Sequence, residues 1–166
     1  MATTFTKIAS VAVGAGGAGT IAFSSIPSTY TDLVLKVSAR TSATSPEMTI
    51  TFNGTSASNT DRLLYNYAGT IGSNTSSPMR ASVDISTQTA SAFGNADIYV
   101  ANYAGATNKS VSIEAVAESN STTDAYQYLN AGLWSNTAAI TTVTLTPVSG
   151  TFVQYSTATL YGISKS

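Results

Sequence analysis

The chain has 166 residues, with seven basic and eight acidic side chains, and it contains neither cysteine nor histidine. One domain of this length can bury enough surface to be stable without disulfides or structural metals. The missing residue types exclude disulfides, thiolate or histidine metal sites and any catalytic triad that depends on histidine. Composition therefore indicates a single domain, and we expect no metal and no cofactor.

The charge pattern also limits the partners of the chain. Only 9% of the residues are charged, and the net charge is −1. A nucleic-acid-binding surface needs clustered basic residues, whereas the basic residues here are scattered. No apolar run approaches the roughly 20 residues of a membrane span, and the N-terminus lacks the pattern of a signal peptide. We therefore expect a non-exported protein that binds neither nucleic acid nor membrane.

The N-terminal residues allow two interpretations. A first strand is predicted at Phe5–Val13, and a run of glycine and alanine follows at Gly14–Gly19. Glycines there can supply positive φ angles at several positions. Residues 1–19 are therefore either a first strand with an ordinary turn, or an arm that hinges at the glycines and reaches a neighbouring molecule.

Further along the chain, the dominant period is two, which is typical of half-buried strands. Apolar and polar residues alternate most clearly in Asp32–Arg40, and again in Val111–Glu118 and Thr142–Thr146. Shorter segments predict further strands at Thr20–Phe23, Met48–Asn53, Arg62–Tyr67, Ala81–Ile85, Ala96–Ala101, Phe152–Tyr155 and Ala158–Ile163. Asn53-Gly54 predicts a β-hairpin with a type I′ turn, because both central residues of that turn need positive φ.

These elements predict an all-β fold. Roughly eight to ten short antiparallel strands, separated by Gly, Pro, Asn and Ser, are typical of a single β-sandwich domain over residues 1–166. A jelly-roll arrangement is the favoured form with this many strands. An immunoglobulin-type sandwich is the alternative, although the chain lacks the Cys-Trp-Cys core of antibody domains.

One tetrapeptide occurs twice, as NYAG at Asn66–Gly69 and at Asn102–Gly105. A stacked repeat would carry this spacing into the flanking residues and would recur at least three times. The flanks differ, so we interpret the echo as two strands that end in similar turns.

One row of aromatic residues is a candidate binding face. In an extended strand, Tyr126, Tyr128 and Trp134 project to one side, and Leu129, Ala131 and Leu133 to the other. Aromatic rings beside amides can stack on sugars or anchor a partner protein. The alternative is that these rings pack into the core.

The acidic residues form no recognisable catalytic or metal-binding motif. Glu114 and Glu118 share a strand face but lie about 13 Å apart, at a rise of ~3.3 Å per residue, which exceeds the carboxylate spacing of glycosidases. No run of acids has the spacing of a calcium loop. We therefore expect a protein that is not an enzyme, although carboxylates from different strands can still meet.

Two long stretches resemble virion proteins of tailed bacteriophages. The first joins Ile8–Val13, the glycine-rich segment and FSSIPSTYTDLVLKVSART at Phe23–Thr41, and the second is SNTAAITTVTLTPVSGTFVQYSTATLYGI at Ser135–Ile163. The FNG turn at Phe52–Gly54, the NYA at Asn102–Ala104 and a tyrosine-rich strand follow the same layout between them. The resemblance therefore spans nearly the whole chain.

The resemblance implies a small β-sandwich module on the virion, without catalytic residues. The favoured form is a capsid decoration or cement protein that binds the major capsid protein on the outside of the head, as a homotrimer. The alternative is a tail-fibre or tail-appendage module that recognises a host-surface glycan, for which Tyr126, Tyr128 and Trp134 are the candidate contacts. Either protein would be made in the host cytoplasm and would function in the virion.

Overall fold

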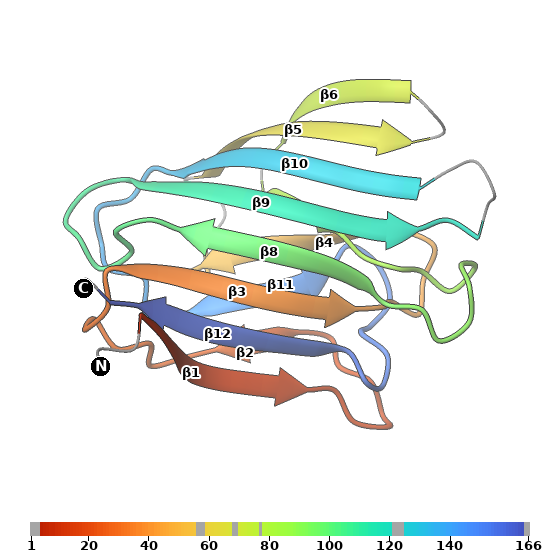
Figure 1. The fold of residues 1–166 in the computed structure, drawn as a ribbon, viewed down its shortest axis with the longest axis horizontal. Helices are drawn as coiled ribbons and strands as arrows, with labels where there is room; N and C mark the ends of the chain where they lie inside the picture. Colours follow the sequence, from red (N-terminus) through yellow and green to blue (C-terminus); the bar gives the residue numbers. More distant parts are fainter. Residues whose placement is uncertain (1–3, 56–58, 68–69, 77, 121–124, 165–166) are drawn as a thin grey trace.

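The computed structural model describes residues 4–55, 59–67, 70–76, 78–120 and 125–164. These residues form twelve strands and no helix (Figure 1). The strands are β1 (Phe5–Ala12), β2 (Ile21–Phe23), β3 (Asp32–Ala39), β4 (Glu47–Phe52), β5 (Asn59–Tyr67), β6 (Thr70–Ser76), β7 (Met79–Ser82), β8 (Gly94–Val100), β9 (Lys109–Glu118), β10 (Ala125–Trp134), β11 (Val143–Pro147) and β12 (Thr157–Ile163). The all-β prediction is confirmed.

The strands form two antiparallel sheets. The larger sheet has eight strands in the order β1-β12-β3-β8-β9-β10-β5-β6, and the smaller has four in the order β2-β11-β4-β7. Figure 1 looks onto the outer face of the larger sheet, and the smaller sheet lies behind it. The chain is therefore a β-sandwich in which one layer is twice as wide as the other.

The strand order is that of a jelly roll. If β5, β6, β9 and β10 are set aside, the order is β1-β12-β3-β8 in one sheet and β2-β11-β4-β7 in the other. This is the two-sheet, eight-strand arrangement of that fold. The other four strands are two sequence insertions that extend the larger sheet beyond β8, which explains why the strand count exceeds eight to ten.

The core lies between the two sheets. Strand β8 alternates between buried and exposed residues along its whole length, and so does β9 up to Ala117. Leu35 and Ile98 of the larger sheet and Ile50 and Leu145 of the smaller are at most 2% exposed. Burial of such side chains stabilises the folded state by about 1.5–3 kcal/mol each. The two-residue period in the sequence therefore reflects strands that bury one face against the other sheet and expose the opposite face.

The N-terminal segment is a strand followed by a turn. Strand β1 pairs with β12, with a β-bulge between Lys7 and Ala9. The amide of Gly17 donates to the carbonyl of Gly14, and Ala18 pairs with Phe152. Gly17 has a φ of 71°, and a Cβ there would lie 2.9 Å from the Phe152 carbonyl. Residues 4–19 therefore belong to the sandwich and do not extend from it as an arm.

Three local predictions have different outcomes. The turn at Asn53-Gly54 is confirmed, because both residues have positive φ and the Thr55 amide donates to the Phe52 carbonyl. The hairpin predicted there is wrong, because β4 and β5 on either side of the turn lie in different sheets. The predicted strand at Phe152–Tyr155 is wrong, because only Phe152 forms bridges and Tyr155 has a φ of 72°. Strand β6 was not predicted, because its sequence TIGSNTS has no apolar alternation.

The two NYA sequences occupy different places. Asn66 and Tyr67 are the last residues of β5, whereas Asn102 and Tyr103 follow β8 in a turn where Asn102 has a φ of 48°. Gly69 lies outside the described residues. The flanking structure therefore shows no common unit around the two sequences.

Candidate binding face

Strand β10 places the predicted aromatic row toward the interior. Trp134 is fully buried, Tyr128 is 7% exposed, and Tyr126 is partly buried. Trp134 meets Phe52 of the smaller sheet edge-to-face, with ring centroids 5.9 Å apart. The prediction that the three rings share a face is consistent with this placement, but Tyr128 and Trp134 are not accessible to a sugar ring.

The buried rings of Tyr128 and Trp134 lie beside polar groups in the core. The Tyr128 hydroxyl donates to Glu47 at 3.1 Å, and burial raises the pKa of this tyrosine. The ammonium group of Lys109 lies 5.5 Å from the Trp134 ring centroid. It donates to the carbonyls of Gly105, Asn136 and Ala138, and burial lowers its pKa. These contacts join two loops at the end of the larger sheet, so they have a structural role.

The opposite face of β10 is an apolar surface open to solvent. The large apolar side chains that are exposed on β8, β9 and β10 are Tyr99, Val116, Leu129 and Leu133, with exposed fractions of 38–46%. We call these four residues the outer patch. They lie on three neighbouring strands in the middle of the larger sheet, which Figure 1 shows from this side. Tyr99 and Leu133 are near one end of their strands and Val116 is near the other end, so polar and small side chains separate them. Exposed apolar side chains on one sheet face can contribute to an interaction site.

A shallow depression of about 390 Å³ lies within this face. Ser112 of β9 is paired with Ala131 of β10, and Tyr99 of β8 is the neighbour of Ser112 on the other side. Glu114 and Leu129, which are also paired, form the next row. The small side chains of Ser112 and Ala131 therefore leave a hollow between larger neighbours.

Two acidic side chains, Asp97 and Glu114, line the depression. Asp97 and Glu114 are directly opposite each other on β8 and β9. Lys36 of β3, opposite Asp97, forms an ion pair with Asp97, and both side chains are about half exposed. No ion pair or hydrogen bond involves the Glu114 carboxylate among the described residues. The Glu114 carboxylate therefore has no cationic partner among the described residues.

The ring of Tyr99 is held in place at the edge of the depression. Its hydroxyl donates to Asp32 at 2.7 Å, and this hydrogen bond raises the pKa of the tyrosine. The second oxygen of Asp32 accepts a hydrogen bond from the Asn102 amide, also at 2.7 Å. The turn after β8 therefore orients an exposed aromatic ring before any ligand arrives.

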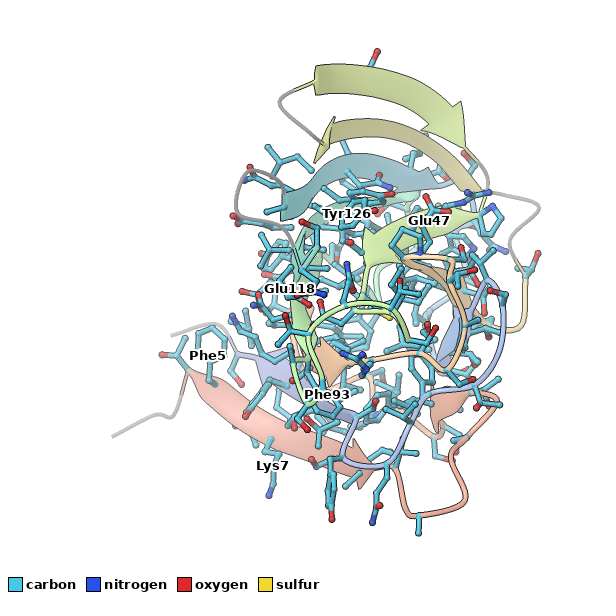
Figure 2. All side chains as sticks on the ribbon, turned by 90° about the vertical axis from the view of Figure 1, so that its right-hand side faces the viewer. Phe5, Lys7, Glu47, Phe93, Glu118 and Tyr126 are labelled. Atoms are coloured by element: carbon cyan, nitrogen blue, oxygen red, sulfur yellow. The ribbon has the colours of Figure 1, made fainter. Side chains whose placement is uncertain are left out.

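A second cluster of charged residues is buried at one end of the sandwich. Figure 2 looks onto this end and labels Glu118 and Phe93. The guanidinium group of Arg40 donates to four carbonyls of the loop between β7 and β8. Asp84 is fully buried, and burial raises its pKa; one oxygen accepts the Glu118 amide and the other has no partner among the described residues. This cluster fixes the loop onto the sheet.

The structure brings together different carboxylates from those that share a strand face in the sequence. Glu118 accepts hydrogen bonds from Thr89 and Asn120 in the loop cluster, whereas Glu114 faces Asp97 in the depression. Periodicity could not have found the Asp97–Glu114 pair, because it depends on the register of β8 and β9. Among the described residues, no three acidic side chains gather closely enough to hold a metal ion.

Comparisons with protein-family models, curated proteins and solved structures found no match to this chain. Within the described part of the chain, there is no helix with the length and apolar character needed to cross a membrane.

Proposed function

We propose that the chain is a non-enzymatic structural protein of a tailed-bacteriophage virion, a decoration protein that binds the outside of the head shell and stabilises it. The observation that carries the proposal is the jelly-roll strand order together with the outer patch. Viral capsid domains and lectins share this fold, and an exposed apolar surface fits a docking role. The resemblance at Phe23–Thr41 and Ser135–Ile163 directs the choice toward the virion.

The outer patch is the surface that would contact the major capsid protein. A fold alone does not define a function, so the proposal depends on this face. Decoration at symmetric positions suits a closed trimer, in which each copy presents the same patch. Linking three weak contacts would make attachment durable, because the second and third contacts form within one complex.

The copy number of the chain in purified particles tests this proposal. A number comparable to that of the major capsid protein is the expected result for a decoration protein. A few copies per particle would favour the tail-appendage alternative, and absence from particles would overturn both. The substitution Leu129→Asp in the outer patch should reduce the copy number, whereas Gln127→Ala beside the patch should not.

The tail-appendage alternative has lost its strongest sequence argument. Tyr128 and Trp134, two of the three candidate glycan contacts of that alternative, are buried. A glycan-binding face would have to use other residues, so the decoration protein is the function that we propose.

A further inference from the structure

The depression beside the outer patch combines an apolar wall with an excess of negative charge. Tyr99 and Leu129 supply the apolar side, and Asp97 and Glu114 supply the carboxylates. Like charges directly opposite each other on neighbouring strands destabilise a sheet. Lys36 offsets this repulsion at Asp97 only. A cation bound between the two carboxylates would relieve the rest of it.

The shape of the depression restricts which cation fits. The depression, of about 390 Å³, is open and much larger than a bare metal ion, and two carboxylates are among the described residues that line it. The exposed Tyr99 ring is fixed by Asp32, so it presents a π face or edge without further loss of rotamer freedom. An ordered aromatic ring near carboxylates is a favourable environment for a guanidinium group, which binds carboxylates in a bidentate manner and stacks on rings.

We propose that this depression receives an arginine side chain of a partner protein. The aliphatic stem would pack against Leu129 and the short side chains of Ser112 and Ala131. The guanidinium group would lie between Asp97 and Glu114, next to the Tyr99 ring. The inference rests on the proposed function where it takes the partner as the capsid shell protein, and it assigns the chemistry of the contact.

The direct test is a titration of the ¹⁵N-labelled protein with acetyl-Gly-Arg-Gly-amide, followed by NMR. The matched control peptide carries citrulline, which has nearly the same shape as arginine but no charge. We expect the arginine peptide to shift the amides of Tyr99, Glu114 and Leu129, and to bind roughly two- to fivefold more tightly than the citrulline peptide, in the range of an exposed ion pair. High salt should remove the difference.

Two substitutions locate the effect. Glu114→Gln should abolish the preference for arginine, because it removes the unbalanced charge on an exposed side chain. Ala131→Trp should block both peptides by filling the depression while leaving both carboxylates in place. Gln127→Ala, on the same strand face but outside the depression, should change neither. Thermal melts of each variant show whether it is folded.

Several results would overturn the inference. Equal binding of the two peptides, shifts confined to other surfaces, or an unchanged preference in Glu114→Gln would each exclude an arginine site here. Binding of neutral oligosaccharide in the depression, lost in Ala131→Trp, in place of the arginine preference would instead identify a glycan site.

The same variants separate this inference from the proposed function. If the peptide results are as expected but the chain is absent from particles, the arginine site stands and the virion role fails. If the chain is abundant on particles and Glu114→Gln binds them equally well, the shell contact lies elsewhere and the inference fails as stated. Loss of Glu114→Gln from particles, together with loss of the arginine preference, supports both.

Discussion

At the residue scale, Lys109 shows how a charged side chain can serve the core. Lys109 is fully buried. Its ammonium group donates hydrogen bonds to three carbonyls from two loops and lies near the Trp134 ring. Nothing in the sequence indicates this role, because Lys109 begins a strand with ordinary alternation. Only the folded loops bring the three carbonyls to one point.

We predict that Lys109→Met destabilises the protein by about 1–3 kcal/mol, because three carbonyls lose a charged hydrogen-bond donor. Urea unfolding followed by Trp134 fluorescence measures the change. Lys7→Met is the matched control: Lys7 is exposed, so its loss should change stability by no more than about 0.5 kcal/mol. Similar losses in both variants would contradict the structural role of Lys109.

The raised pKa of buried Asp84 leads us to predict that this residue makes stability fall as the pH rises. Burial raises its pKa, with smaller effects from the Glu118 amide, the Glu118 carboxylate and Arg40. The folded protein therefore holds this proton more tightly than the unfolded chain. The stabilisation is present at low pH, below the unfolded pKa, and is lost as the pH rises through the folded pKa.

The substitution Asp84→Asn isolates this effect, because it keeps an oxygen for the Glu118 amide and removes the charge. As the pH rises from about 4 to about 7, the free energy of unfolding of Asp84→Asn should increase relative to that of the wild type. Urea unfolding at both pH values measures it. Parallel pH profiles for the two proteins would show that Asp84 does not titrate differently on folding.

At the element scale, the sequence predicted the strands that bury one face. It did not predict correctly where backbone pairing or turn conformation determines the structure. The alternation in Asp32–Arg40 and Val111–Glu118 located β3 and β9 to within two residues. Strand β6 lacks apolar alternation, and its pairing with β5 is the feature that defines it. At Tyr155, a left-handed turn ended what the apolar and β-branched residues indicated as a strand.

For the candidate site, the sequence predicted which side chains of β10 share a face but not which face is exposed. Period two showed that Tyr128 and Trp134 lie opposite Leu129 and Leu133 on β10. It could not show which side is outside, because both sides of this strand are apolar. The smaller sheet decides this, and the Phe52 contact with Trp134 comes from a strand far away in sequence.

The start of β8 carries a prediction about close packing. A Cβ at Gly94 would lie 2.9 Å from the Asp84 amide nitrogen and 3.0 Å from the Val116 carbonyl oxygen, and both atoms belong to backbone. Gly94→Ala should therefore destabilise the protein by about 1–3 kcal/mol. Gly14→Ala, where a Cβ meets nothing within 4 Å, is the control and should stay within about 0.5 kcal/mol. Thermal or urea unfolding distinguishes them, and equal stability of both variants would contradict the packing argument.

At the scale of the whole molecule, three of the four sheet edges are poor places for association. Strand β1, at one edge of the larger sheet, contains a β-bulge next to the exposed Lys7. Strands β2 and β7, at the edges of the smaller sheet, have three and four residues. Bulges, lysines and short edges all discourage strand addition. Strand addition is therefore disfavoured at these three edges, whereas the proposed contact uses a sheet face.

The position of the insertions has a consequence for how such a protein can change over time. Strands β9 and β10 lie outside the eight strands of the jelly roll, yet they carry Glu114, Val116, Leu129 and Leu133. Their outward side chains contribute little to the core that holds the roll together. Under the proposed docking role, substitutions at these outward positions change the contact surface while the eight-strand roll stays intact, so recognition and folding can evolve as nearly separate traits.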